Sequence, residues 1–483
     1  MNYEFPKIRF GLILFVTAAL ILIVSTVPFA SNAAEMTDSQ IQHIVATSVQ
    51  LLMNGEEPTA EQDHKIQSLK AMVEQNDIGQ KQIGRIVKDQ FFAGMEKHRL
   101  SRYEIGNMLK RAPVLLPAVT GKEVHEILWE KAVQMLEEPL VLKTATMAPH
   151  GTPWIIFPKT TINRHMKKIS KEKFSARVYA GGVMGEDIDI LRKMDMGQLD
   201  GCGCSALGTF KAIPELAVFS LPRLFRNYDE IDHIITTFRK EIDIEAEKKG
   251  YYIDFIADSG FFYIWLKNKV TNLDALRKQK MLTWMGDVEI AIFDDLKIHP
   301  IPVPVPEVVA SLSTGLINAH VSPAPWVLGT QAYLQDRYYI EQPLYYTPGV
   351  QIFSRKAFMD RFRGKYPDNL IHNFIELRIY EVRTFEREYI DKNLRPYEAK
   401  CLAAFQKQGI KPIKLNDKDM AEIDAAAKRV WNELADKVYS KAFLDKILQE
   451  LENYRNKKNT CPSGASKIVT GLSSPPDLCS VDS

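Results

Sequence analysis

The stretch GGVMGEDIDILRKMDMGQLDG, residues 181–201, places a glycine turn beside a short helix pattern and a second turn. A glycine pair opens it, helix-forming residues run from about Asp187 to Met196, and Gly197 is the expected helix stop. Another strand is expected from Leu199. The stretch therefore predicts a strand–turn–helix–strand unit, which is the repeating element of an α/β sheet.

The same stretch excludes two ligand chemistries. It contains neither G-x-x-x-x-G-K-[ST] nor G-x-G-x-x-G, the glycine spacings that hold phosphate, and its acids Glu186, Asp187 and Asp189 would repel phosphate. These acids also lack the alternate spacing of a calcium loop, and no Glu stands at the twelfth position. We therefore expect neither a phosphate loop nor a calcium loop here.

Strands and helices alternate on both sides of this stretch. LVLKTAT, residues 140–146, reads as a strand, followed by a helix from about Trp154 to Ile169 and a strand over 175–179. Such alternation predicts βαβ units and a largely parallel sheet. Ligands of open α/β sheets lie at the carboxyl ends of the strands, so the loops there are expected to face a cleft.

The chain length and the net charge limit the domain count and the classes of function. The chain has 483 residues, enough for two or three domains, and 62 Lys and Arg residues nearly balance 60 Asp and Glu residues. A net charge of +2 does not provide the concentrated basic face that nucleic-acid binding needs. We therefore expect no nucleic-acid partner.

The N-terminus has the pattern of an export signal. Lys7 and Arg9 precede an apolar run from Phe10 to Ala30, and residues 31–33 supply the small side chains of a cleavage site. We expect a signal peptide over residues 1–33, cleaved after Ala33. The run is nearly long enough to span a bilayer, so a retained anchor is the alternative. Both readings place the rest of the chain outside the cytoplasm.

A helical module is expected over residues 35–138. Four capping boxes recur there, in which a hydroxyl caps a helix start and a Glu or Gln three residues later reaches back; they are Thr37 with Gln40, Thr59 with Gln62, Ser101 with Glu104, and Thr120 with Glu123. The pattern predicts four or five short helices and contains no catalytic cluster. We expect this module to fold separately and to meet a protein partner or the rest of the chain.

Three of the five cysteines are expected to be structural. Cys461 and Cys479 lie in a Ser-, Pro- and Gly-rich segment, a flexible tail over residues 456–483, and can pair in an oxidising compartment. Cys401 lies in a helical pattern and is interpreted as a small buried side chain.

The other two cysteines, Cys202 and Cys204, form a C-x-C pair. Together with His150 or His320 they are candidates for metal ligands. The alternative is that they are two small apolar side chains on one face of a strand, and this reading needs no metal.

From Leu140 to about Leu451 the order of motifs resembles the extracytoplasmic solute receptors of tripartite ATP-independent periplasmic (TRAP, DctP-like) transporters. The motifs that carry the resemblance are APHGT (148–152), YAGGVMGED (179–187), MDMGQLDG (194–201), IPEL (213–216), SLPRLFRNYDE (220–230) and SLSTGLINA (311–319). Each motif is weakly specific, whereas their shared order over some three hundred residues is strongly specific.

The resemblance implies an α/β, two-lobed periplasmic solute-binding fold over residues 139–455, with hinge strands and a long helix that braces both lobes. An apolar stripe from Ile371 to Tyr389, ended before Pro396, fits that helix. The implied function is capture of a small molecule in the periplasm and its delivery to TRAP membrane subunits. No catalytic residue and no cofactor are implied.

The sequence departs from this family at the site that holds a substrate carboxylate. Typical members carry an arginine on the strand that corresponds to residues 276–284, and Leu282 takes its place here. A second cationic position falls at Phe262. Without these arginines a buried carboxylate loses roughly 3–5 kcal/mol of pairing, on the order of a hundred- to a thousandfold in affinity.

We therefore expect a neutral or mainly apolar ligand. Trp284 and Trp326 stand at a predicted strand end and in a predicted loop, where indoles can contact a ligand. The candidate polar anchors are Asp287, Ser205, His150 and Glu186, each of which can instead be a surface or capping residue.

Two other hypotheses compete with a solute receptor. One is a secreted metalloenzyme that uses the C-x-C pair and the two histidines, but no H-E-x-x-H helix or nucleophile elbow accompanies them. The other is an anchored periplasmic interaction protein, in which a degenerate receptor body displays the helical module.

Overall fold

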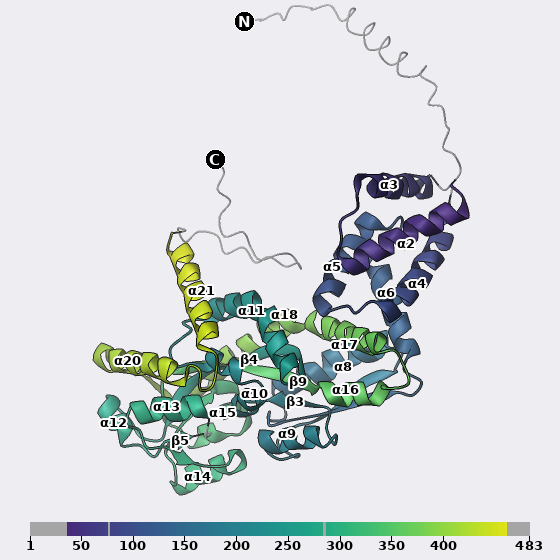
Figure 1. Ribbon diagram of the computed structural model, residues 1–483. Helices are drawn as coiled ribbons and strands as arrows, with labels where there is room; N and C mark the ends of the chain where they lie inside the picture. Colours follow the sequence, from purple (N-terminus) through teal and green to yellow (C-terminus); the bar gives the residue numbers. More distant parts are fainter. Residues whose placement is uncertain (1–35, 76–77, 284–285, 461–483) are drawn as a thin grey trace, which may run out of the picture.

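The computed structural model describes residues 36–75, 78–283 and 286–460 (Figure 1). The described part begins with the helices α2 (Asp38–Asn54), α3 (Ala60–Glu74), α4 (Gln80–Lys97), α5 (Arg102–Leu115) and α6 (Gly121–Gln134). The four predicted capping boxes are present, each with both reciprocal hydrogen bonds. We call α2–α6 the helical module.

A mixed eight-stranded sheet follows the module. Its strands are ordered β10–β8–β4–β9–β3–β1–β2, with β7 also paired to β4. β1 runs parallel to β2 and β3, whereas β9 and β4 run antiparallel to their neighbours. The expectation of a largely parallel sheet is therefore wrong for its centre. The strands are β1 (Leu140–Thr146), β2 (Phe174–Tyr179), β3 (Gly201–Cys204), β4 (Tyr251–Leu266), β7 (Ala319–Pro323), β8 (Tyr338–Ile340), β9 (Tyr345–Ser354) and β10 (Lys411–Ile413).

The long strands β4 and β9 join two lobes. β4 pairs with β9 from Tyr251 to Phe262, and with β7 and β8 over its last residues. The β4–β9 pairing shifts between Asp258 and Gly260, where Gly260 has a φ of +110° that only glycine adopts easily. β1–β3 belong to the first lobe, and β7, β8 and β10 belong to the second. Residues 258–262 form the crossing between them.

A broken helix runs along both lobes. It comprises α17 (Asp368–Arg383), α18 (Glu386–Glu388), the π-helix η5 (Tyr389–Leu394) and α19 (Arg395–Lys407). The expected end before Pro396 is wrong, because Pro396 lies in the first turn of α19, where its missing N–H breaks no helical hydrogen bond. The bracing helix of the expected fold is therefore present and longer than the sequence pattern indicated.

The remaining elements cover the sheet and build the lobes. The first lobe has α7 (Pro153–Phe157), the π-helix η1 (Pro158–Ile162), α8 (Asn163–Ile169), α9 (Asp187–Asp195), α10 (Ala206–Ala212), the 3-10 helix η2 (Pro214–Ser220) and α16 (Arg355–Phe362). The second has α12 (Leu273–Arg277), β5 (Leu282–Thr283), α13 (Asp287–Asp295), β6 (Ile301–Pro302), η3 (Val305–Glu307), α14 (Val308–Thr314), α15 (Ala324–Gly329), η4 (Ala332–Leu334) and α20 (Asp417–Leu434). α11 (Tyr228–Lys248) packs on β4 and on α21 (Lys441–Thr460), which runs five residues past the expected tail boundary.

The helical module shares its hydrophobic core with the first lobe. Trp129 of α6 packs edge-on against Phe374 of α17, with ring centroids 6.5 Å apart, and Phe174 of β2 meets the same ring at 6.1 Å. Figure 1 shows α17 between the module and the sheet. The module is therefore packed on the receptor body.

Within the described ranges, no helix is long and apolar enough to cross a membrane.

Candidate ligand site

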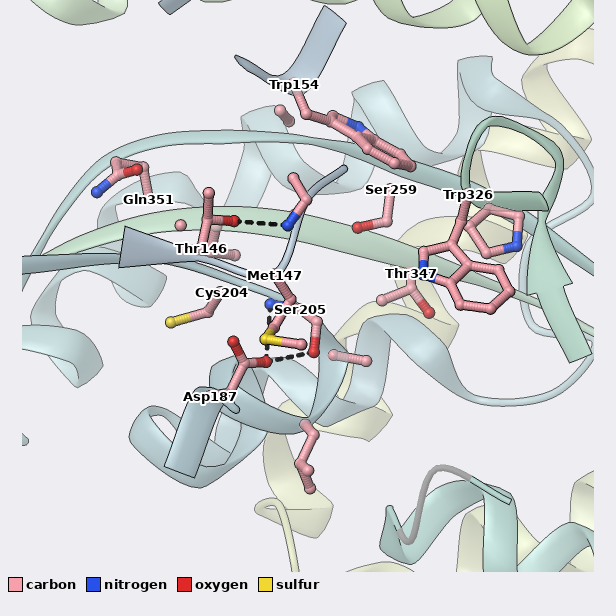
Figure 2. A pocket seen from close by; sticks show the side chains of 18 of the residues that line it. Thr146, Met147, Trp154, Asp187, Cys204, Ser205, Ser259, Trp326, Thr347 and Gln351 are labelled. Carbon is pink, nitrogen blue, oxygen red and sulfur yellow. Dashed lines mark hydrogen bonds between the residues drawn. The ribbon is translucent and has the colours of Figure 1, made fainter. Parts of the chain in front are cut away.

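A cavity of about 210 Å³ lies where the lobes and the hinge strands meet. The first lobe lines it with the turn after β1 and with the starts of α7, α9 and α10, and the second with α13, η3 and α15. β4 and β9 form its floor (Figure 2). This position, at the ends of β1 and β3, is the ligand position expected of an open α/β sheet.

The charged groups on the cavity wall are acidic. Among the described lining residues there is no Lys, Arg or His, whereas Glu186, Asp187 and Glu289 are present. A carboxylate ligand would therefore find no cation on this part of the wall.

Asp187 is bound by the start of α10. Its Oδ2 atom accepts hydrogen bonds from the backbone N–H of Ser205 at 3.1 Å and from the Ser205 hydroxyl (Figure 2). It also accepts one from the backbone N–H of Gly208 at 3.2 Å. Burial raises the pKa of Asp187, although these hydrogen bonds act in the opposite direction. Gly208 is needed because a Cβ there would lie 2.7 Å from the Asp187 side chain. The protein's own carboxyl group thus occupies an anion position.

Glu289 is the buried acid of the wall in the second lobe. It lies in the first turn of α13 and accepts hydrogen bonds from the Thr283 hydroxyl at 3.0 Å and the Tyr345 hydroxyl at 2.9 Å. Burial and the neighbouring Glu289 raise the pKa of Tyr345 well above its ordinary value, so Tyr345 remains a donor.

Aromatic side chains form much of the remaining wall. Trp154 of α7 and Trp326 of α15 line the cavity from opposite lobes, and Phe262 stacks on Tyr345 with centroids 5.0 Å apart. The Trp154 indole N–H donates to the carbonyl of Asp258 at 3.0 Å, which fixes its ring.

Small polar groups are interspersed among them. The Ser220 hydroxyl donates to Thr347 at 3.0 Å, and the Thr146 hydroxyl accepts from the backbone N–H of Ala148 at 3.2 Å. Ser259 and Gln351 also line the cavity from the hinge strands.

A buried polar network holds the crossing of β4. The Asp258 carboxylate accepts hydrogen bonds from Arg395 and from the Tyr346 hydroxyl, both at 2.7 Å. The Glu398 carboxylate accepts from the backbone N–H of Phe261 at 3.2 Å and from the Tyr228 hydroxyl. Burial raises the pKa of Glu398 to about 7. The irregular part of the hinge strand is therefore tied to α19 by titratable groups.

Four of the eight residues expected at the site line the cavity: Phe262, Trp326, Ser205 and Glu186. His150 and Asp287 are exposed and lie outside the described lining, and Leu282 is fully buried in the second-lobe core instead of facing the cavity. Trp284 lies outside the described residues, although Gly286, two positions later, is part of the wall.

The cysteines do not gather with the histidines. Cys202 and Cys204 are joined by a disulfide on β3, and His320 lies in the second-lobe core, where its ring contacts Ser322 and Asp336. Over the described ranges no group of three or more His, Cys, Asp or Glu side chains is placed to hold a metal ion. Cys401 is free and buried, as expected, while Cys461 and Cys479 lie outside the described residues.

Several wall residues were not expected from the sequence. Trp154 and Ser259 are partly buried residues of the wall, and Glu289 and Asp187 supply acidic groups. A usable signal for Trp154 was its place directly after Pro153, at a helix start that follows a strand end. For Ser259 the signal was the glycine beside it inside a long strand pattern.

Residues 144–438 match the family model described as bacterial extracellular solute-binding protein, family 7 (DctP). Among solved structures, a TRAP periplasmic solute-binding protein from Haemophilus influenzae with bound L-gulonate is similar, with 16% identity and a TM-score of 0.56 over 65% of this chain and 99% of that chain. The sugar acid binding protein of Advenella mimigardefordensis, in complex with galactonate, has 19% identity and a TM-score of 0.58 over the same shares. At these identities the structures establish the fold alone.

Proposed function

Since the chain belongs to the DctP family of bacterial extracellular solute-binding proteins, family 7, we propose that it is a TRAP receptor for a neutral or mainly apolar ligand. Membership makes it a non-enzymatic, extracytoplasmic receptor that binds a small molecule for transport into the cell through TRAP membrane subunits. The ligand class is the part that we propose.

The proposal rests on one observation: the carboxylates in the cavity belong to the protein's own side chains. Helix starts attract anions, because their N–H groups are unpaired and the helix dipole is positive there. Here Asp187 binds the start of α10 and Glu289 lies in the first turn of α13. Asp187 takes backbone N–H groups that a ligand carboxylate would need, and Glu289 takes two hydroxyl donors. No described lining residue offers a cation.

A ligand carboxylate would therefore lose its hydration without gaining a partner. An unpaired charge in such a site costs several kcal/mol, and the nearby acids add repulsion. The two similar structures contain L-gulonate and galactonate, both sugar acids, so this chain is proposed to differ from them in the charge of its ligand.

We also propose that the partner of the helical module is the receptor body itself. The Arg102 guanidinium of α5 donates to Glu376 of α17 at 2.6 and 2.7 Å and to Glu247 of α11 at 2.7 Å. Asn373 of α17 accepts from the Leu100 N–H at 2.7 Å and donates to the Met95 carbonyl at 2.8 Å. This contact favours the receptor over an interaction protein that merely displays its module.

The test is isothermal titration of the full chain with succinate, malate, sialic acid and L-gulonate, alongside native mass spectrometry of protein purified without refolding. We expect no acid to bind at micromolar concentration and any co-purified molecule to be neutral. Micromolar or tighter binding of one acid would overturn the proposed ligand class. It would leave family membership intact.

A further inference from the structure

The size of the cavity limits the ligand. An apolar cavity of about 150 Å³ is large enough to take up benzene. The cavity between the lobes measures about 210 Å³, so it has room for one six-membered ring with a short substituent. A fused ring system or a long chain would require the lobes to open further.

The two cavity tryptophans come from different lobes. Trp154 is the second residue of α7 in the first lobe, and its ring is fixed by the hydrogen bond to the Asp258 carbonyl. Trp326 lies in α15 of the second lobe, and its ring packs at 63° on His320, with centroids 6.2 Å apart. Both are only partly buried, unlike Trp265, which is fully enclosed in the second-lobe core. A flat ligand between them would contact both lobes at once.

Ser259 lies between these indoles in Figure 2, on the irregular part of β4. Its hydroxyl makes no hydrogen bond with any residue in the described ranges, whereas the hydroxyls of Ser205 and Ser220 donate to Asp187 and Thr347. A Cβ at Gly349 would lie 3.1 Å from the Ser259 hydroxyl, so a glycine there keeps space for it.

The neighbours of Ser259 cannot easily turn to satisfy it. Asp258 is engaged through its carbonyl by Trp154 and through its carboxylate by Arg395, and the Phe261 N–H is engaged by Glu398. The backbone on both sides of Ser259 is therefore held in place. A hydroxyl fixed in this way is preorganised for a ligand atom.

We infer that the ligand is a neutral single-ring molecule with one hydroxyl or carbonyl group, its ring lying between Trp154 and Trp326 and its polar group hydrogen-bonded to Ser259. The inference rests on the proposed function, because a neutral ligand is its premise. It adds the ring, the polar group and the residue that selects it.

The test uses four probes on the full chain: benzyl alcohol, benzoate, heptan-1-ol and ethylbenzene. Benzyl alcohol carries the ring and the hydroxyl, and each of the others changes one feature, namely charge, ring or hydroxyl. We expect benzyl alcohol to bind at least tenfold more tightly than benzoate and severalfold more tightly than heptan-1-ol. Saturable binding is measured by ligand-observed NMR.

Variants connect the preference to named residues. Ser259→Ala should weaken benzyl alcohol about fivefold, the usual effect of one neutral hydrogen bond, and leave ethylbenzene unchanged. Trp154→Leu and Trp326→Leu should each weaken both ring probes, whereas Trp431→Leu, whose indole binds the Pro222 carbonyl away from the cavity, should not. The unchanged ethylbenzene affinity also controls for folding of the serine variant.

The outcomes separate the two proposals. Tightest binding of benzoate would overturn the proposed neutral ligand, and the ring inference with it. Equal or tighter binding of heptan-1-ol, or equal weakening of benzyl alcohol and ethylbenzene by Ser259→Ala, would overturn the inference alone. Failure of every ring probe to saturate would also overturn it, and the titrations with acids would still decide the proposed function.

Discussion

The Oε1 atom of Glu186 accepts a hydrogen bond of 2.9 Å from the backbone N–H of Val305, and this bond joins the two lobes across the cavity. Glu186 stands just before α9 of the first lobe, and Val305 begins η3 of the second. Both residues line the cavity, so the bond is made only when the lobes are close together. It stabilises the closed arrangement without contributing a positive charge to the site.

Glu186→Ala should therefore shift the protein toward an open arrangement. A hydrogen bond to a charged acceptor is worth roughly 1.5–3 kcal/mol, so ligand affinity should fall about tenfold or more. Small-angle scattering should show a larger radius of gyration in the unliganded variant. Glu186→Gln keeps an acceptor and should remain near the unmodified protein, and Glu307→Ala, exposed at the end of η3, should change neither quantity. An unchanged radius for Glu186→Ala would show that the bond does not control closure.

Glu398 predicts how stability depends on pH. Its folded pKa of about 7 lies above the ordinary glutamate value of 4.5, chiefly because burial disfavours the ionised carboxylate. The folded protein therefore holds a proton that the unfolded chain releases between these values, and stability falls as pH rises from about 4.5 to 7. The full loss is on the order of 3 kcal/mol.

Glu398→Gln should remove this dependence. Its melting temperature should match that of the unmodified protein near pH 5 and exceed it at pH 8, where the native carboxylate is ionised and buried. The comparison is thermal unfolding at several pH values, with Glu388→Gln, more exposed on the same broken helix, as the control. A constant difference between the two proteins at all pH values would mean that Glu398 does not titrate in this range.

The predictable parts of the fold are those specified by neighbours in sequence. The capping boxes at Thr37 and Ser101 and the helix stop at Gly197 were found because a cap or a positive φ depends on a few adjacent residues. It was harder to predict which residues of a strand face the cavity. Phe262 faces the cavity and Leu282 does not, because in a strand a shift of one residue exchanges the two faces and β5 has only two residues to fix the register.

Contacts between distant parts of the chain could not be predicted in this way. Arg102 and Glu376 are 274 positions apart, and no local pattern in α5 indicates that one of its arginines is buried. The acidic character of the cavity could not be predicted from the sequence for the same reason. Glu289 follows an ordinary helix start, and only the pairing of β4 with β9 brings Tyr345 and Ser259 to the same space.

Arg102 provides a test of the contact between module and receptor. Its guanidinium is buried among Glu376, Glu247 and Asp243, so Arg102→Ala would leave Glu376 charged and without its main partner. Breaking a buried ion pair costs roughly 3–5 kcal/mol. The matched control is Arg111→Ala, on the same helix, whose acidic partner Glu57 is 83% exposed and whose ion pair is worth under about 1 kcal/mol. Equal melting temperatures for the two variants would contradict a structural role for the Arg102 cluster.

Removal of residues 36–138 tests whether the module is separable at all. The shared core would be opened along α17, exposing Phe374 and its neighbours, and Glu381 would lose its hydrogen bond with His125 of α6, which measures 2.5 Å. Burial alone would raise the pKa of Glu381, but its hydrogen bonds with His125 and His165 outweigh this effect, so the pKa is lowered. The truncation would therefore leave an ionised carboxylate with one of its partners missing. We therefore expect the remainder to be aggregation-prone or to melt far below the full chain, in contrast to the separate folding that the capped helices suggest.

The measurement is size-exclusion chromatography and thermal unfolding of both chains, each with the benzyl alcohol probe. A monomeric remainder with the melting temperature and probe affinity of the full chain would show that the module is an appendage, and that α17 braces the lobes without it.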